Sequence, residues 1–145
     1  MPVGQICSRI VATAAPGEYV RVAARRMAVN DVGTLVVVAD ADPSEAIGIV
    51  TDRDVALRCV AGELDPDVTH VSQVMTHPVE TIDESVSIDD AMTRMATLGL
   101  RRLVITSDGH KLVGILTLDD VLDHLMHELQ PIGRLLDKQH PRLPG

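Results

Sequence analysis

The sequence predicts a fold of the α+β or α/β class, built from two β-α-β-β-α repeats that are related by a pseudo-twofold axis. Two observations carry this prediction. First, GIVTDRD (48–54) and GILTLDD (114–120) agree at four of seven positions and begin 66 residues apart. Second, the apolar pattern changes in the same order around each phrase, from helical spacing to short continuous runs and back to helical spacing.

The repetition extends through the first helix of each unit, at an offset of 68 residues. In this register Val20, Ala23, Arg26, Met27 and Ala28 fall on Ile88, Ala91, Arg94, Met95 and Ala96. The offset falls to 66 at the glycines, so the first copy carries two extra residues in ADADPSEA (39–46). Insertions of this kind fall in loops, because packed elements cannot shift to accept them.

Each copy contains two segments in which apolar residues recur at helical spacing. The first helix is expected at 20–28 and at 88–95, and the second at 55–60 and at 121–129. The second helix of the second copy carries an apolar stripe that is generous for so small a unit, formed by Val121, Leu122, Leu125, Met126 and Leu129. The excess apolar surface predicts a homodimer, for which an isologous contact is the usual geometry.

Three strands are expected in each copy. The central runs TLVVVA and RLVIT are rich in β-branched residues and short enough for buried strands. Turn residues follow them, DADPSE in the first copy and SDGH in the second. The expected strands lie at 9–13, at 34–39 and up to Thr51, and at 78–82, at 102–106 and up to Thr117.

We divide the chain into a first repeat (1–62), a linker (63–73), a second repeat (74–129) and a C-terminal tail (130–145). Val71 to Met75 are expected to form a helical turn where the linker meets the second repeat. The tail contains three prolines. It is therefore expected to be mobile at its end, or to pack on the dimer.

Composition excludes several function classes. The net charge of −8 and the single tyrosine disfavour a nucleic-acid partner, which needs a basic surface and stacking platforms. No apolar run approaches the roughly 20 residues that span a bilayer, and the start MPVGQICSRI lacks the layout of a secretory signal. We expect no membrane partner, a cytoplasmic location, and reduced side chains at Cys7 and Cys59.

GIVTDRD and GILTLDD resemble the strand-to-helix signature of cystathionine-β-synthase (CBS) domains, glycine-apolar-x-apolar-Thr/Ser-x-x-Asp. Residues 75–122 look like a full second CBS repeat, including the Arg101-Arg102 pair before the strand. Residues 51–76 resemble the passage between repeats in small stand-alone bacterial CBS-pair proteins. The resemblance covers about residues 4–129, nearly the whole chain.

The resemblance implies a tandem pair, or Bateman module, whose cleft between the sheets binds adenosine-containing ligands such as AMP, ADP, ATP, S-adenosylmethionine or NAD species. It implies that Asp54 and Asp120 accept hydrogen bonds from ribose hydroxyls, with Thr51 and Thr117 near the ribose or a phosphate. The first repeat departs from the family pattern, because it has Gly33-Thr34 where the second has Arg101-Arg102. It also lacks the usual strand proline. We therefore expect two clefts that are not equivalent.

The T-x-x-D phrases also have a purely structural interpretation. Thr51 with Asp54, and Thr117 with Asp120, have the spacing of a helix N-cap followed by an acid at the third helical position. The two roles are compatible, because a helix N-terminus that holds a phosphate presents the same amides that a cap satisfies. A carboxylate also offers two acceptor oxygens to a vicinal diol.

The remaining candidate ligand contacts are aliphatic or charged. Without Phe or Trp, an adenine slot must be aliphatic, and the candidates are Val11, Val79, Ile49 and Ile115. Arg53 is either a phosphate contact or a solvated helix-start residue, and Asp119 occupies the equivalent position in the second phrase. Arg101 and Arg102 either contact a phosphate or interact with the preceding helix C-terminus.

Catalysis and metal binding have little support. No Ser or Cys nucleophile has a recognisable base partner, and no cofactor is required. His124 and His127 are spaced to share a helix face, but no Cys, Asp or Glu pattern completes a metal site, so we interpret them as surface residues.

The sequence thus predicts a non-enzymatic regulatory CBS-pair protein that senses an adenine nucleotide or adenosyl ligand in the cleft between its repeats. The regulated protein partner is not identified by the sequence. Two alternatives remain open: a dimerisation and partner-interaction module with a vestigial cleft, and an enzyme fragment or metal-binding stress protein.

Overall fold

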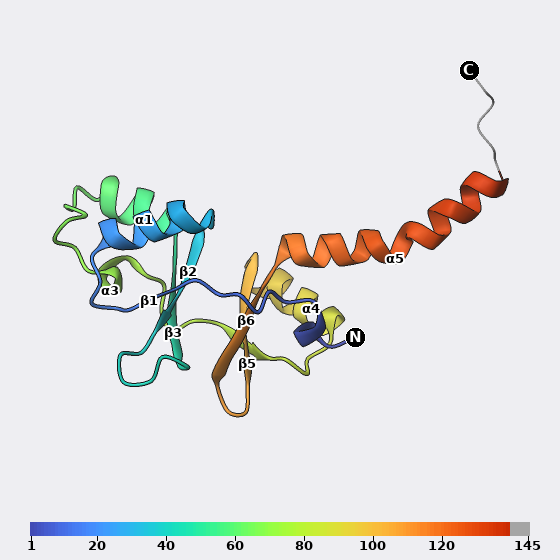
Figure 1. Cartoon of the computed structure of the whole chain (residues 1–145), viewed down its shortest axis with the longest axis horizontal. Helices are drawn as coiled ribbons and strands as arrows, with labels where there is room; N and C mark the ends of the chain where they lie inside the picture. The colour runs from blue at the N-terminus through green and yellow to red at the C-terminus, as the bar shows by residue number, and fades with distance from the viewer. Residues whose placement is uncertain (140–145) are drawn as a thin grey trace, which may run out of the picture.

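The computed structural model describes residues 1–139 as two three-stranded sheets that face each other, with helices on their outer sides (Figure 1). The first sheet has the order β1 (Thr13–Ala14), β2 (Thr34–Val38), β3 (Ala46–Thr51). The second has the order β4 (Thr81–Asp83), β5 (Arg102–Ser107), β6 (Lys111–Thr117). In both sheets the first pair of strands is parallel and the second pair is antiparallel.

The helices follow the same duplicated order. The first repeat contains η1 (Val3–Gln5), α1 (Val20–Asn30), α2 (Asp52–Asp54) and the π-helical η2 (Val55–Val60). The second contains α3 (Val71–Val74), α4 (Ile88–Leu98) and α5 (Leu118–Gln139). The predicted β-α-β-β-α order is therefore confirmed in each half.

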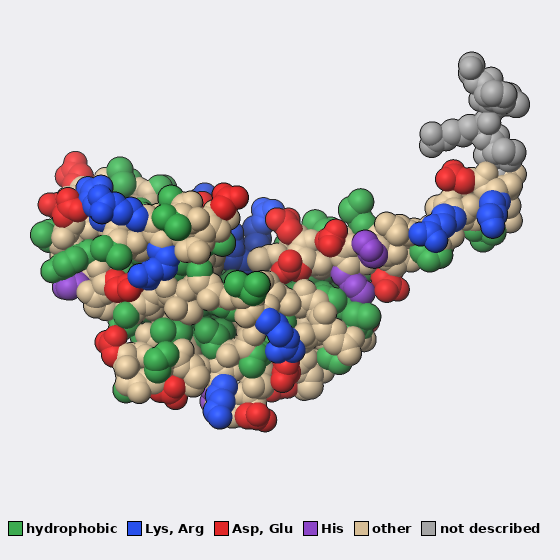
Figure 2. Space-filling model, in the orientation of Figure 1, with side chains coloured by type: hydrophobic (Ala, Val, Ile, Leu, Met, Phe, Trp, Pro, Cys, Tyr) green, Lys and Arg blue, Asp and Glu red, His purple; other side chains and the backbone are tan. Residues whose placement is uncertain are grey.

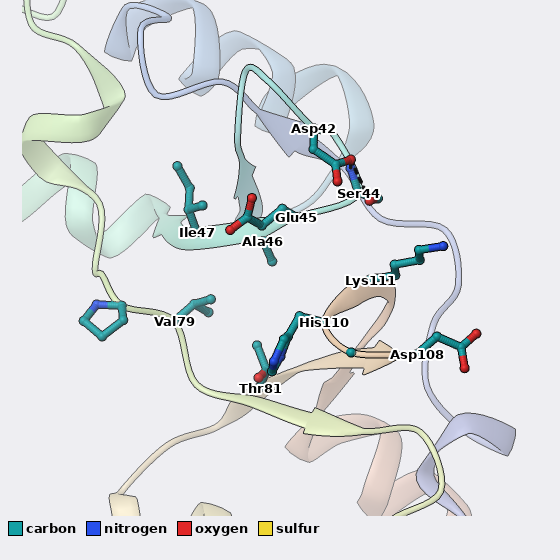
Figure 3. Close-up of a pocket in the computed structure, with 12 residues that line it drawn as sticks. Asp42, Ser44, Glu45, Ala46, Ile47, Val79, Thr81, Asp108, His110 and Lys111 are labelled. Atoms are coloured by element: carbon teal, nitrogen blue, oxygen red, sulfur yellow. Dashed lines mark hydrogen bonds between the residues drawn. The ribbon is translucent and has the colours of Figure 1, made fainter.

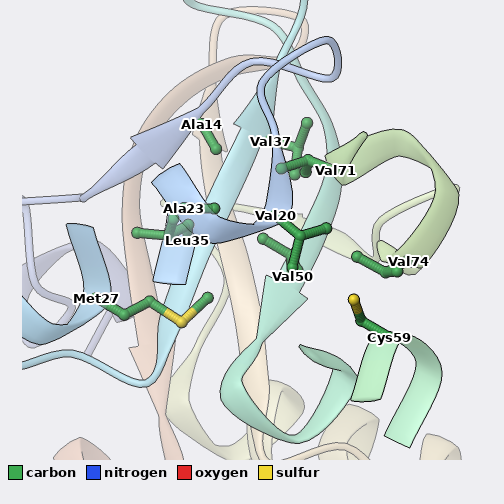
Figure 4. Close-up of a cluster of buried hydrophobic side chains, with 10 residues drawn as sticks. All are labelled: Ala14, Val20, Ala23, Met27, Leu35, Val37, Val50, Cys59, Val71 and Val74. Atoms are coloured by element: carbon green, nitrogen blue, oxygen red, sulfur yellow. The ribbon is translucent and has the colours of Figure 1, made fainter. Parts of the chain in front are cut away.

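Three apolar clusters hold these layers together. One lies between the first sheet and its helices and includes Val20, Leu35 and Val50 (Figure 4). A second, equivalent cluster lies outside the second sheet. The third lies between the two sheets, around the buried side chains of Val36 and Val104. Because the two inner faces pack on each other, the sheets form one continuous interior.

Each repeat donates a short segment to the core of the other repeat. Val3 of η1 is fully buried in the cluster of the second sheet. Val71 and Val74 of α3 are fully buried in the cluster of the first sheet, as Figure 4 shows. Backbone hydrogen bonds fix both segments, from Val3 N to Val86 O and from Val71 N to Glu18 O, each 2.8 Å long. The two halves therefore complete each other.

The exchanged segments are themselves a repeat that the strand and helix patterns did not reveal. VGQICS (3–8) and VSQVMT (71–76) align at the same offset of 68 residues as the first helices. The helical turn expected at Val71 to Met75 is present as α3. However, this turn belongs to the packed unit, so the structured second repeat begins inside the region expected to be a linker (63–73).

The first strand of each copy is shorter and begins later than the predicted ranges 9–13 and 78–82. The reason is that the chain crosses from one sheet to the other just before these strands. Ser8 exchanges two backbone hydrogen bonds with Ile115, of 3.0 and 2.9 Å, and Thr76 does the same with Ile49, at 2.8 and 3.0 Å.

The C-terminal region also differs from expectation. Residues 130–139 were expected to form a separate tail, but α5 continues through Pro131 to Gln139. Proline removes one helical hydrogen bond, and the exposed surface of α5 lets water satisfy the freed carbonyl. Figure 1 shows α5 changing direction along its length, as a proline within a helix produces. The predicted mobile end, residues 140–145, lies outside the described residues. No helix within residues 1–139 is long and apolar enough to cross a membrane.

The glycines of the two repeated phrases are explained by the crossing segments. A Cβ added at Gly114 would lie 2.7 Å from Ser8 O and 2.8 Å from Cys7 Sγ. A Cβ at Gly48 would lie 2.8 Å from Met75 Sδ and 3.0 Å from a backbone carbonyl of the other crossing segment. Only glycine lets the crossing chain approach the sheet closely enough to form its hydrogen bonds.

We predict that Gly114→Ala lowers the free energy of unfolding by about 1–3 kcal/mol, because the new methyl group overlaps backbone that cannot move aside. Gly17→Ala is the matched control, since nothing lies within 4 Å of a Cβ at that position. Urea unfolding followed by circular dichroism measures both variants. Equal stability of the two would show that the close approach is not required.

Candidate functional site

Both T-x-x-D phrases form capping boxes at a strand-to-helix junction. The Thr51 hydroxyl accepts a hydrogen bond from Asp54 N (3.1 Å), and Asp54 Oδ2 accepts one from Thr51 N (2.9 Å). Thr117 and Asp120 repeat the arrangement with the same two distances. The structural interpretation is therefore confirmed, and each cap uses only one of the two carboxylate oxygens.

The second carboxylate oxygen has different surroundings in the two copies. Asp54 Oδ1 lies 3.7 Å from Arg58 Nε, one turn further along the chain. Among the described residues, no Lys, Arg or His lies within ion-pair distance of Asp120. Asp120 therefore keeps one oxygen available to accept a hydrogen bond.

A cavity of about 260 Å³ opens beside Asp120, and we call it the Asp120 cleft. It is lined by the crossing segment before β1, the start of β2, the start of β5, the end of β6 and the first turn of α5. Five predicted ligand residues lie in it: Val11, Arg102, Ile115, Thr117 and Asp120. Its volume is just below the range of small-molecule pockets, roughly 300–1,000 Å³.

One residue in the lining of the Asp120 cleft has a buried polar atom without a partner. Thr34 begins β2 and lines the cleft, and its hydroxyl oxygen is buried without a hydrogen-bond partner among the described residues. A buried hydroxyl in this state costs roughly 1–3 kcal/mol. In the sequence, Thr34 stands out only because it occupies the position that Arg102 has in the second repeat. Its unsatisfied hydroxyl depends on burial, which sequence alone does not show.

The other predicted site residues lie elsewhere. Arg53, Arg101 and Asp119 are exposed, and none of them lines the Asp120 cleft. Ile49 and Val79 pack against the cluster between the sheets, together with Val11 and Ile115 of the cleft. The structure therefore brings five of the twelve predicted residues into one cavity.

The position in the second repeat that corresponds to Ala12 is occupied by a charged residue. Glu80 stands where the cleft has Ala12, as the matching hydrogen bonds to Val104 N and Val36 N show. The Glu80 carboxylate pairs with Arg94 at 3.0 Å. The Asp54 and Asp120 sides of the pair are therefore unequal, because the Glu80–Arg94 ion pair stands where the Asp120 side has the methyl group of Ala12.

A larger cavity of about 660 Å³ lies between the two hairpin loops (Figure 3). The loops contact each other through the hydrogen bond from Leu112 N to Ser44 O (2.7 Å). Its charged side chains, such as Glu45 and Lys111, are exposed, and it contains neither T-x-x-D aspartate. Hydrogen bonds from Ser44 lower the pKa of Asp42. The Asp42 carboxylate therefore already has hydrogen-bond donors within its own loop.

The cysteines and the histidines of α5 are the remaining candidate reactive groups. Cys7 and Cys59 are both free, and burial raises the pKa of the Cys7 thiol. His124 Nε2 lies 3.9 Å from Glu128 on α5. Within residues 1–139, no three His, Cys, Asp or Glu side chains are grouped closely enough to hold a metal ion.

We predict that Thr34→Val stabilises the ligand-free protein by about 1 kcal/mol, because it removes an unsatisfied buried hydroxyl while keeping the side-chain shape. Thr117→Val is the matched control and should lose about 1 kcal/mol, because its hydroxyl is the helix cap. Chemical unfolding without ligand measures both. A destabilised Thr34→Val protein would mean that the hydroxyl has a partner in solution.

Comparison with known proteins identifies relatives over almost the whole chain. The model of the family described as the CBS domain matches residues 3–60 and 71–127. The chain is 36% identical over 120 residues to an uncharacterized protein of Methanopyrus kandleri, covering 83% of this chain and 60% of that protein. It is 38% identical over 133 residues to the CBS domain-containing protein YhcV of Bacillus subtilis, covering 92% and 91% of the two chains. The chain thus spans less than two thirds of the first of these relatives.

Solved structures show the same architecture. A putative signal-transduction protein with CBS domains from Burkholderia ambifaria superposes with a TM-score of 0.80 and 32% identity, covering 90% of this chain and 97% of that one. A CBS domain protein from Pyrobaculum aerophilum, solved with AMP, gives 0.76 and 25%, covering 88% and 99%. Hypoxic Response Protein I, solved with two coordinated zinc ions, gives 0.76 and 27%, covering 86% and 98%.

Proposed function

The chain belongs to the CBS domain family as a tandem pair of repeats, and from this premise we propose that it is a non-enzymatic regulatory protein that binds an adenine nucleotide or adenosyl ligand. The Asp120 cleft is the proposed site. The single observation that carries the proposal is the free carboxylate oxygen of Asp120 at a helix N-terminus, in a cavity that Thr34, with its unsatisfied hydroxyl, also lines.

Each part of an adenosyl ligand has a matching feature in the cleft. The free oxygen of Asp120 accepts from a ribose hydroxyl, because a carboxylate is a strong acceptor for a diol. The guanidinium of Arg102 and the amides at the start of α5 favour a phosphate. Val11 and Ile115 offer aliphatic walls to the adenine ring. The Thr34 hydroxyl gains the hydrogen-bond partner that it lacks.

The relatives support the general class of ligand, an adenine nucleotide or adenosyl compound, and not one particular ligand. The P. aerophilum protein was solved with AMP and shares the fold over nearly its full length. We propose the same class of ligand here. The choice among AMP, ATP, S-adenosylmethionine and NAD species is left to experiment.

We propose that the second side of the pair binds the ligand more weakly or stays empty. Asp54 would be its ribose acceptor, with Thr51, Arg53 and Arg101 as further contacts. However, the second oxygen of Asp54 faces Arg58, and Glu80 brings a charged group to the position that Ala12 occupies in the Asp120 cleft. Both features raise the cost of placing a nucleotide there.

The mechanism proposed is a change in the arrangement of the two repeats or of two chains in a cytoplasmic homodimer. The Asp120 cleft is lined by the crossing segment 8–12, by β2 of the first repeat and by α5 of the second. A ligand in it touches both repeats at once. It shifts their arrangement to the extent that it binds one arrangement more tightly than another.

A second candidate function is metal binding, for which the specific observation is the zinc-containing structure of Hypoxic Response Protein I. In this chain His124 and His127 would be the first residues to consider. Elemental analysis of protein purified without a histidine tag tests it, and one zinc or more per chain would favour this candidate.

We predict that calorimetric titration with AMP, ATP, S-adenosylmethionine and NADH reveals binding of at least one of them. Asp120→Ala should weaken that binding by at least about tenfold, because a charge-assisted hydrogen bond contributes roughly 1.5–3 kcal/mol. Asp54→Ala is the matched control, since it removes the equivalent cap, and it should change the main affinity less than about threefold.

Two results would contradict the proposal. Folded protein that gives no heat with any of the four ligands would leave the interaction module with a vestigial cleft as the better description. Equal affinity of the Asp120→Ala variant and the unchanged protein would refute the ribose assignment, even if a ligand binds.

A further inference from the structure

Helix α5 leaves the body of the protein after its first turns. Val121 is buried against the second sheet, and His124 is half-buried. From Leu125 to Gln139 every residue is exposed. Figure 2 shows this part of α5 projecting beyond the rest of the surface. The second half of the helix therefore has no packing partner within the described chain.

The projecting helix carries large apolar residues at alternating spacings of four and three. They are Leu118, Leu122, Leu125, Leu129, Ile132 and Leu136. The last five have exposed fractions of 49%, 38%, 59%, 53% and 52%. This spacing is the a/d pattern of a coiled coil, which places all six side chains on one stripe of the helix. We call this stripe the α5 seam.

The polar residues of α5 agree with the seam. His127, Pro131 and Arg134 fall on the opposite face at helical spacing. The bend-inducing proline and the charge of Arg134 are thus kept away from the stripe. A helix that exposes a regular leucine seam is stabilised when a second helix covers it, because the side chains then interdigitate and leave water.

The charges on α5 indicate what covers the seam. Residues 119–128 carry four carboxylates and no Lys or Arg, whereas residues 130–139 carry Arg134 and Lys138 against one Asp. An antiparallel copy of the same helix places the acidic half of each beside the basic half of the other. It also sets the two helix dipoles in opposite directions. A parallel copy would place four carboxylates beside four.

We propose that the α5 seam is the contact between two copies of this chain, which pair their α5 helices antiparallel about a twofold axis. With Leu122 opposite Ile132 of the second copy, and Leu125 opposite Leu129, all six seam residues find an apolar partner. The contact is isologous and closes on itself, so it produces a dimer and not a filament. This inference deepens the proposed homodimer and does not depend on which ligand the cleft binds.

Sedimentation equilibrium tests the pairing. The unchanged protein is expected to be a dimer, and the double variant Leu129→Lys, Ile132→Lys a monomer, because two ammonium groups cannot be buried in the seam. His127→Lys is the matched control, with the same substitution on the opposite face of the same helix, and it should remain a dimer. Circular dichroism establishes that each variant is folded.

Three outcomes would overturn the proposal: a monomeric unchanged protein, a double variant that still dimerises, or a dimer that is broken by Leu57→Lys on η2 but not by the seam variant. Leu57 is 53% exposed, so it matches the seam residues in exposure. The double variant keeps every residue that lines the Asp120 cleft and should still bind ligand there, with an affinity that changes only by the coupling between ligand binding and pairing. Pairing and ligand binding can therefore fail separately.

The antiparallel direction has its own test. Chains with Leu122→Cys and chains with Ile132→Cys are mixed and oxidised. Antiparallel pairing brings these two positions within disulfide reach and gives the mixed cross-link. Parallel pairing instead gives each variant cross-linked to itself, which would overturn the proposed direction. The unchanged chain, with only Cys7 and Cys59, serves as the background control.

Discussion

The exchange of short segments between the two repeats is the contact on which the rest of the structure depends. Residues 3–8 complete the core of the second repeat, and residues 71–76 complete that of the first. Each half has only three strands, the smallest sheet that is expected to be stable by itself. With the exchange, the crossing chain also closes one wall of the Asp120 cleft. Folding and site formation therefore rest on the same contact.

The elements with strong periodicity could be predicted from sequence, and those defined by a distant partner could not. The α1 and α4 stripes and the β-branched runs of β2 and β5 were recognised because the signal lies within a few residues. The segment η1 is three residues long, so it has no periodicity to detect. The segment α3 was expected as a helical turn, but its place in the core of the first repeat was not. Comparison of VGQICS with VSQVMT at the established offset was the one signal that could have revealed them. In the tail, the prolines predict mobility, whereas the leucine spacing of α5 continues on both sides of Pro131.

In the candidate site, too, the local sequence signals predicted some features and the features that depend on distant residues were missed. The T-x-x-D phrases predicted both the caps and the position of the cleft, because the duplicated spacing fixes the strand-to-helix junctions. What the sequence could not supply was the difference between the two aspartates. That difference arises from Arg58, one helical turn after Asp54, and from Glu80, which takes the backbone position of Ala12 and pairs with Arg94. The unsatisfied hydroxyl of Thr34 depends on burial by residues from both repeats, and no local pattern encodes it.

Helix α5 connects the cleft to the projecting seam without a break. Its first turn contains Asp120, and its last described residue is Gln139. The turns of α5 before Pro131 form one continuous helical segment, so a ligand that reorients the first turn would also reorient the part of the seam that precedes the proline. The body holds the first turns of α5 through the buried side chain of Val121, the Thr117–Asp120 capping box and the hydrogen bond from Leu118 N to Arg101 O. Under the function and the pairing proposed above, a ligand that touches the crossing segment and Asp120 together would act at the base of the helix through which two chains meet.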